Sequence, residues 1–111
     1  MARELRILGP NRFEKVAVGA RLKLKVRVAD AGAPSNGAPV YFEALRPDLV
    51  EFGTMADSNS DVIHSHDDGT AEAWVTLKPG SAGLALQVKA QIFTGNDGDT
   101  DTVWFSIAVN P

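Results

Sequence analysis

One stretch of the chain, residues 20–30 (ARLKLKVRVAD), alternates charged and apolar side chains without a break. Its two sets of side chains are Arg21, Lys23, Lys25 and Arg27, and Leu22, Leu24, Val26 and Val28. A period of two gives a β-strand one apolar face and one face toward water. In a helix the same apolar residues would be spread around the axis and could not form one continuous buried stripe. The pattern therefore predicts a half-buried strand, around which the other strands must be arranged.

The apolar face of this strand needs a second apolar face to cover it. Similar alternation returns in residues 71–77, 84–92 and 103–109. Two packed sheets are the arrangement that buries such faces against one another. The sequence therefore predicts a two-sheet sandwich with residues 20–30 at its centre.

Shorter strands are expected on either side of the central one. Glu4–Leu8 and Lys15–Val18 are strand candidates, and Pro10 between them lacks an N–H group for a ladder, which marks an edge strand that breaks and can change sheets. After a turn rich in Gly and Pro comes Val40–Leu45, and weaker strand signals cover Val50–Phe52 and Asp61–His66.

The alternation also predicts which side chains of the later strands point inward. These are Val40, Phe42 and Ala44; Ala71, Ala73, Val75 and Leu77; Leu84, Leu86, Val88, Ala90 and Ile92; and Val103, Phe105, Ile107 and Val109. Seven or so strands, each followed by a turn signal, favour an all-β, immunoglobulin-like two-sheet β-sandwich. At 111 residues the chain fits a single domain, 1–111.

Composition limits the partners of this domain. The net charge of −3 argues against nucleic acid, because phosphate contacts demand a basic excess. No apolar run is long enough for a signal peptide or a membrane helix, so we expect no membrane insertion. The chain has no cysteine, which excludes disulfides and thiolate chemistry but leaves the compartment open. It is either used in the cytoplasm or in a particle assembled there, or is a domain cut from a larger secreted protein.

Three stretches carry a family resemblance: residues 26–30 (VRVAD), 36–42 (NGAPVYF) and 68–77 (DGTAEAWVTL) followed by Ala82-Gly83. Together they resemble the bacterial immunoglobulin-like group 1 (invasin/intimin-type) domains over about residues 20 to 109. Where that family often has an aromatic residue after the Ala-Gly turn, this chain has Leu84-Ala-Leu. The resemblance implies a non-catalytic module, a rigid spacer or binding surface in adhesins and, in related forms, on phage particles.

Two polar clusters are candidate metal sites. His64 and His66 would share one strand face, and imidazoles at this spacing can chelate a transition metal, although a polar strand edge explains them as well. Residues 96–101 (NDGDTD) are rich in oxygen ligands but lack the later glutamate of an EF-hand, and a solvated hairpin accounts for them equally. We therefore assign no metal and no cofactor. No nucleophile elbow, phosphate loop or zinc-protease motif is present, so an enzyme is not expected.

Two exposed faces are candidate docking surfaces. The basic stripe Arg21, Lys23, Lys25 and Arg27 could meet an acidic partner, but we favour pairing within the sheet with Glu72 and Trp74 of the neighbouring strand. On the other sheet, the register places Tyr41, Gln87, Lys89 and Trp104 on the outer face. Their large contact area and polar tips suit a protein partner, although each ring could instead merely shield the ladder.

The sequence thus favours a structural or interaction module, an immunoglobulin-like domain displayed on a larger assembly such as a phage particle (virion) or contractile apparatus. One alternative is a repeat of a bacterial surface adhesin, located at the cell surface. The other is a carbohydrate-binding module, since outward aromatic rings on a sandwich can stack on the sugars of a cell-surface glycan.

Overall fold

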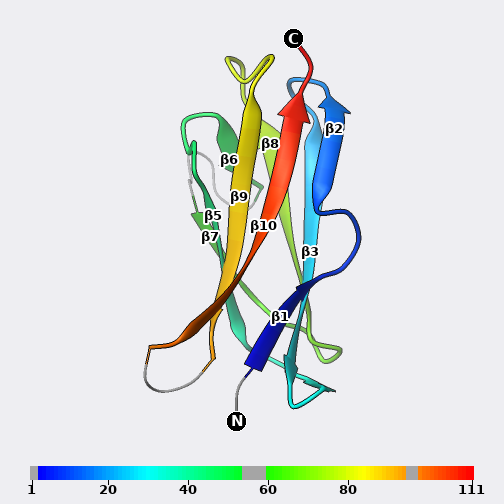
Figure 1. The fold of residues 1–111 in the computed structure, drawn as a ribbon, viewed down its shortest axis with the longest axis vertical. Helices are drawn as coiled ribbons and strands as arrows, with labels where there is room; N and C mark the ends of the chain where they lie inside the picture. Colours follow the sequence, from blue (N-terminus) through cyan, green and yellow to red (C-terminus); the bar gives the residue numbers. More distant parts are fainter. Residues whose placement is uncertain (1–2, 54–59, 95–97) are drawn as a thin grey trace.

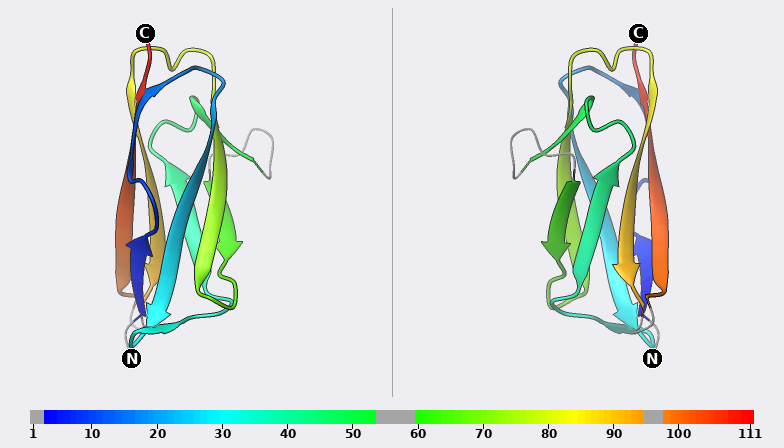
Figure 2. Two further views of the ribbon diagram at one scale, coloured as in Figure 1. Left: turned by 90° about the vertical axis from the view of Figure 1, so that its right-hand side faces the viewer. Right: turned by 90° about the vertical axis from the view of Figure 1, so that its left-hand side faces the viewer.

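The computed structural model describes residues 3–53, 60–94 and 98–111, and within them it is entirely β-structure arranged in two layers (Figures 1 and 2). The strands are β1 (Arg3–Ile7), β2 (Arg12–Val16), β3 (Arg21–Asp30), β4 (Ala33–Pro34), β5 (Pro39–Ala44), β6 (Val50–Phe52), β7 (Ser60–His64), β8 (Thr70–Leu77), β9 (Ala85–Phe93) and β10 (Thr100–Val109). One sheet has the order β1-β3-β8-β6, with β4 attached to β3, and the other has the order β2-β10-β9-β5-β7. The expected immunoglobulin-like sandwich is confirmed, and the described residues form ten strands in place of about seven because several short strands are added to the sheets.

The first part of the chain contributes to both sheets. β1 pairs antiparallel with β3, whereas β2 pairs parallel with β10 of the opposite sheet. Between them the chain passes through Gly9, which has a φ of 88°, and through Pro10. The expected break and change of sheet at Pro10 are therefore confirmed.

The central strand is β3, as its alternation predicts. It pairs with β8 from Arg21 opposite Thr76 to Arg27 opposite Thr70. Leu24, Val26 and Val28 are fully buried, and the facing sheet covers them with the inward side chains of β5, β9 and β10. The core therefore lies between the two apolar faces that the sequence predicts.

Most of the inward positions are confirmed, but Leu84 is not. Its side chain is 37% exposed, and β9 begins only at the next residue. The Leu84 N–H donates to the carbonyl of Ser81, and Gly83 before it has a φ of 76°, so Leu84 belongs to the turn. Alternation applies only where the backbone is extended, and Leu84 lies before the extended residues of β9 begin. Val103 is inward but only partly buried.

The region from 49 to 69 shows where the weak strand signals fall. β6 matches Val50–Phe52, whereas β7 ends at His64, two residues before the expected strand end. The next residue, Ser65, is buried: its Oγ accepts the N–H of Ala38 at 2.9 Å and donates to the carbonyl of Ser35. This hydroxyl ties the chain after β7 to the turn before β5.

The molecule is elongated, with principal extents of 45 × 24 × 22 Å. β1 begins at one pole, and β10 runs to the C-terminal residues at the opposite pole (Figure 1). No helix in the described ranges is long and apolar enough to cross a bilayer.

Candidate protein-interaction site

The outer face of the β2-β10-β9-β5-β7 sheet carries the four side chains expected there. Trp104 lies opposite Lys89, and Gln87 lies opposite Ser106, on the paired strands β10 and β9. Tyr41 of β5 lies opposite Gln91 of β9, on the same face. Tyr41 is 38% exposed and Trp104 is 42% exposed. The predicted placement of Tyr41, Gln87, Lys89 and Trp104 on one outer face is confirmed; their binding role stays a prediction.

The structure adds two apolar side chains to this face. Phe93 is 47% exposed and its ring meets that of Tyr41 edge to face, with centroids 5.6 Å apart. Val62 of β7 lies directly opposite Tyr41 and is 46% exposed. Phe93 falls one residue past the expected end of its strand, and Val62 lies in the least regular part of the sequence. Alternation continued one step beyond Ile92 would have shown that Phe93 points outward.

Lys89 lies at the centre of this face between an acid and an aromatic ring. Its Nζ is 3.3 Å from a carboxylate oxygen of Glu43, the residue opposite it on β5. Trp104 flanks it on β10. An exposed ion pair of this kind contributes little to stability, but it neutralises the ammonium charge beside the exposed ring.

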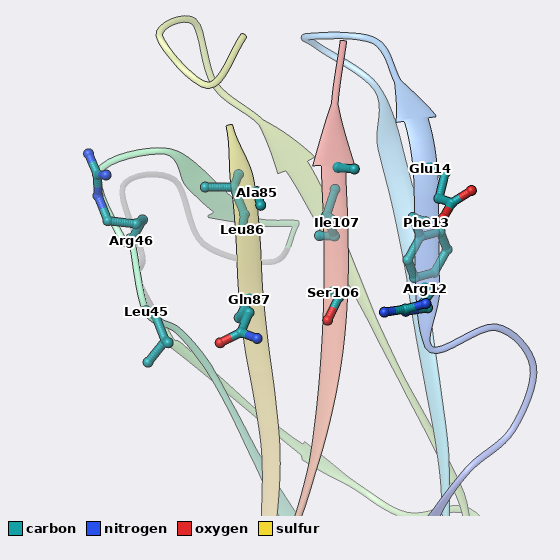
Figure 3. Close-up of a pocket in the computed structure, with 11 residues that line it drawn as sticks. Arg12, Phe13, Glu14, Leu45, Arg46, Ala85, Leu86, Gln87, Ser106 and Ile107 are labelled. Atoms are coloured by element: carbon teal, nitrogen blue, oxygen red, sulfur yellow. The ribbon is translucent and has the colours of Figure 1, made fainter. Parts of the chain in front are cut away.

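A hollow of about 640 Å³ opens on this sheet near its C-terminal pole (Figure 3). On β9 it is lined by Ala85, Leu86 and Gln87, and on β10 by Ser106, Ile107 and Ala108. The lining residues also include Arg12, Phe13 and Glu14 of β2 on one side and Leu45 and Arg46 after β5 on the other. The hollow is therefore built from β2, β9 and β10 and from the residues that follow β5.

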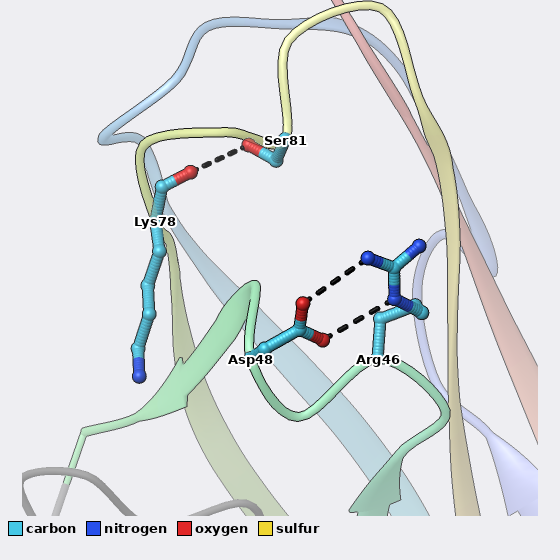
Figure 4. A network of polar contacts seen from close by, with 4 residues as sticks. All are labelled: Arg46, Asp48, Lys78 and Ser81. Carbon is cyan, nitrogen blue, oxygen red and sulfur yellow. Dashed lines mark hydrogen bonds and ion pairs between the residues drawn. The ribbon is translucent and has the colours of Figure 1, made fainter.

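An ion pair lies at the margin of the hollow (Figure 4). Arg46 donates from Nε and from a terminal nitrogen to the two carboxylate oxygens of Asp48, at 3.2 and 3.1 Å. These hydrogen bonds lower the pKa of the Asp48 carboxyl and raise the pKa of Arg46. In the adjacent turn, the Ser81 hydroxyl donates to the carbonyl of Lys78 at 2.8 Å. The charge of Arg46 is therefore already neutralised by Asp48 of the same turn.

Two residues of the basic stripe on the other sheet, Arg21 and Lys23, make the expected contacts within that sheet. Lys23 Nζ is 3.0 Å from a carboxylate oxygen of Glu72. The Arg21 guanidinium and the Lys23 ammonium both lie over the Trp74 ring, 4.8 and 5.2 Å from its centroid. These contacts confirm the predicted cross-strand ion pair and cation–π contact.

The structure does not bring the residues of the two candidate metal sites together in the same way. His64 is the last residue of β7. His66 lies in the turn that follows, where its N–H donates to the carbonyl of Thr70, so the two histidines do not share a strand. Across the described ranges no group of three or more His, Cys, Asp or Glu residues is placed to hold a metal ion. Of the stretch 96–101, Asn96 and Asp97 lie outside the described residues. Asp101 accepts the backbone N–H of Leu5 at 2.9 Å and so ties β10 to β1.

Comparisons with known proteins agree on the fold. No protein-family model matches the chain, and no curated protein matches it significantly. Among solved structures it is similar to the S-layer protein SbsC, domains 4 and 5, with a TM-score of 0.58 and 11% identity over 96% of this chain and 44% of that one. It is also similar to a conjugative transposon lipoprotein from Bacteroides eggerthii DSM 20697, with a TM-score of 0.61 and 11% identity over 96% of both chains.

Two further solved structures share the fold. The titin M3 domain matches along the whole length of both chains, with a TM-score of 0.50 and 8% identity. A family 123 glycoside hydrolase from Clostridium perfringens matches with a TM-score of 0.54 and 13% identity, but this chain spans only 28% of that protein. At these identities the likenesses show the fold: the chain is an immunoglobulin-like β-sandwich.

Proposed function

We propose that this chain is a non-catalytic structural and interaction module, displayed on a larger assembly such as a phage particle or contractile apparatus. It docks through the outer face of β10, β9 and β5, on which Tyr41, Gln87, Lys89 and Trp104 lie. The observation that carries the proposal is that exposed Tyr41, Phe93 and Trp104 lie on the same face of this sheet. Aromatic side chains with polar tips are the anchors that protein interfaces favour.

Two further points support this assignment. On the opposite face the Trp74 ring, 39% exposed, already contacts two cations of its own sheet, those of Arg21 and Lys23. The resemblance of the sequence to bacterial immunoglobulin-like group 1 domains favours a module without catalysis. The nature of the assembly is testable from the neighbouring genes: capsid or tail genes support the particle.

A repeat of a surface adhesin is the second candidate, and the positions of the chain ends favour it. β1 begins at one pole and the chain reaches the other pole after β10, so such domains could follow one another in line (Figure 1). A signal peptide and tandem repeats upstream in the same reading frame would decide for the adhesin and against the particle.

The docking face is tested by one substitution and its matched control on the other sheet. Trp104→Ala should cost at least ~2 kcal/mol of affinity for a capsid or tail protein encoded beside this chain, with a small change in melting temperature. Trp74→Ala should lower the melting temperature, because its ring packs against Arg21 and Lys23, and leave the affinity unchanged. Calorimetric titration and thermal unfolding measure both quantities.

The reverse result would refute the docking face. If Trp104→Ala lowers the melting temperature strongly while the affinity is unchanged, the ring is structural and the face is wrong. If the chain binds sugars on a glycan array, and Trp104→Ala removes that binding, the module binds carbohydrate instead of a protein assembly.

A further inference from the structure

The sequence contains a single Asn-Gly pair, Asn36-Gly37, in the turn that leads into β5. Both residues are exposed, and Gly37 has a φ of 75°. In such a pair the backbone nitrogen of the glycine can attack the asparagine side chain, because glycine has no Cβ atom to hinder the approach. The contacts that surround this turn therefore decide whether the pair reacts.

A buried serine from beyond β7 holds the turn together. The Oγ atom of Ser65 accepts the N–H of Ala38 at 2.9 Å and donates to the carbonyl of Ser35. The first and fourth residues of a β-turn often bond directly to each other. Here the hydroxyl bridges them, and Ser65 is only 4% exposed. The closed form of the turn therefore depends on a side chain that lies outside it.

The backbone of Ser65 also holds the reactive nitrogen of the pair. The N–H of Gly37 donates to the carbonyl of Ser65 at 2.8 Å, and the N–H of Ser65 donates to the carbonyl of Ala38 at 2.9 Å. The proton on the Gly37 nitrogen is thus bound within the folded chain. This nitrogen can react only after its hydrogen bond opens, because base from the solvent must first remove that proton.

We propose that Asn36 is a deamidation site that the contacts of Ser65 keep closed. When the turn opens, the Gly37 nitrogen attacks Cγ of Asn36 and a succinimide ring forms. The new bond from nitrogen to Cγ replaces the bond from Cγ to the side-chain nitrogen, which leaves as ammonia with the proton lost from Gly37. Water then hydrolyses either ring carbonyl, which gives aspartate or isoaspartate at position 36. Water is the only co-reactant that these steps consume.

Either product alters the turn. Each adds a negative charge, and isoaspartate also lengthens the main chain by one carbon atom before Gly37. The Ser65 hydroxyl then no longer fits between the Ser35 carbonyl and the Ala38 N–H. Ala38 is buried, and a buried donor that loses its partner destabilises the folded chain. The isoaspartate form should therefore unfold at a lower temperature than the original chain.

The test follows deamidation of the whole chain at mildly alkaline pH by mass spectrometry of its peptides, since conversion of an amide to an acid changes the mass. Asn36 of the folded wild type should react at least about 10-fold more slowly than in the same chain unfolded in urea. That factor corresponds to about 1.4 kcal/mol of opening free energy. Asn36→Ser should remove the mass change from this peptide.

Two serine variants test the role of the hydroxyl. Ser65→Ala should speed deamidation of the folded chain about 10-fold, because the buried N–H of Ala38 loses its partner. Ser81→Ala is the matched control, since Ser81 is also buried and its hydroxyl bonds within a different turn. It should leave the rate at Asn36 unchanged. Hydrogen exchange at the Gly37 amide should rise in Ser65→Ala and stay unchanged in Ser81→Ala.

Three results would overturn this assignment: no acid at position 36 even in the unfolded chain, equal rates in the folded and unfolded wild type, or a Ser65→Ala variant that reacts no faster than Ser81→Ala. If Ser65→Ala does not fold, the wild type decides the question in urea below its unfolding transition. Deamidation should then accelerate in parallel with hydrogen exchange at the Gly37 amide. Deamidation that accelerates without faster exchange would show that the reaction does not pass through the opened turn.

Discussion

At the scale of single residues, Gly69 is the described glycine at which an added Cβ atom would meet the closest contact. It lies in the turn before β8 with a φ of 81°, and its carbonyl accepts the N–H of Val28 at 2.8 Å. A Cβ atom at this position would collide with the backbone carbonyl oxygen of Val28. Backbone atoms in a paired strand cannot move aside as a flexible side chain can. Gly69 is therefore required both for its conformation and for close approach to β3.

Replacing Gly69 with Ala should destabilise the domain for two separable reasons. The left-handed backbone costs about 1–2 kcal/mol with a Cβ present, and the collision adds about 1–3 kcal/mol of overpacking. Gly19→Ala is the matched control, because Gly19 has a φ of 87° with nothing within 4 Å of the added atom. Urea unfolding should give Gly69→Ala a clearly larger loss than Gly19→Ala; equal losses would mean that strain alone matters.

At the scale of the element, the register of β3 determines which positions accept charge. Val26 is fully buried between the sheets, whereas Lys25 is on the outer face opposite Glu72. Neighbouring residues of one strand thus meet opposite environments, because side chains alternate across the sheet.

Val26→Asp and Lys25→Asp test this register. Val26→Asp buries an unpaired carboxylate at a cost of several kcal/mol, against a total stability of about 5 to 15 kcal/mol, so the domain should not fold. Lys25→Asp should cost little, because its side chain stays in contact with water. The yield of soluble protein and its circular dichroism measure both; an equal loss in the two variants would contradict the register.

At the scale of the whole molecule, the two outer faces should have different roles. Lys23→Glu combined with Lys25→Glu removes the Lys23–Glu72 ion pair and the Lys23 contact with Trp74, and brings like charges together. The melting temperature should fall modestly, because exposed pairs contribute about 1 kcal/mol or less each. Affinity for the assembly partner should stay unchanged. Loss of partner binding with unaltered stability would instead assign docking to the basic face.

The sequence by itself determined the sandwich and its interior. Alternation is a local property, so Leu24, Val26 and Val28 had to share one face wherever the chain is extended, and Pro10 could only interrupt a strand. The outward placement of Tyr41 and Trp104 follows from the same rule. Leu84 marks the limit of this reasoning, because the turn before it ends the extended backbone on which alternation depends.

Only the tertiary structure decided which of these outward side chains meet. Tyr41 touches Phe93, Lys89 lies between Glu43 and Trp104, and side chains from β9 and β10 together line a hollow. Each of these contacts joins different strands, and those of Tyr41 and Glu43 with β9 join strands that are far apart in the sequence. The physical reason is that neighbours across strands depend on the choice of pairing partner and on the register, which turns and the packed core fix together. Which side chains are buried depends on the local alternation along each strand, whereas a binding surface exists only after the strands are paired.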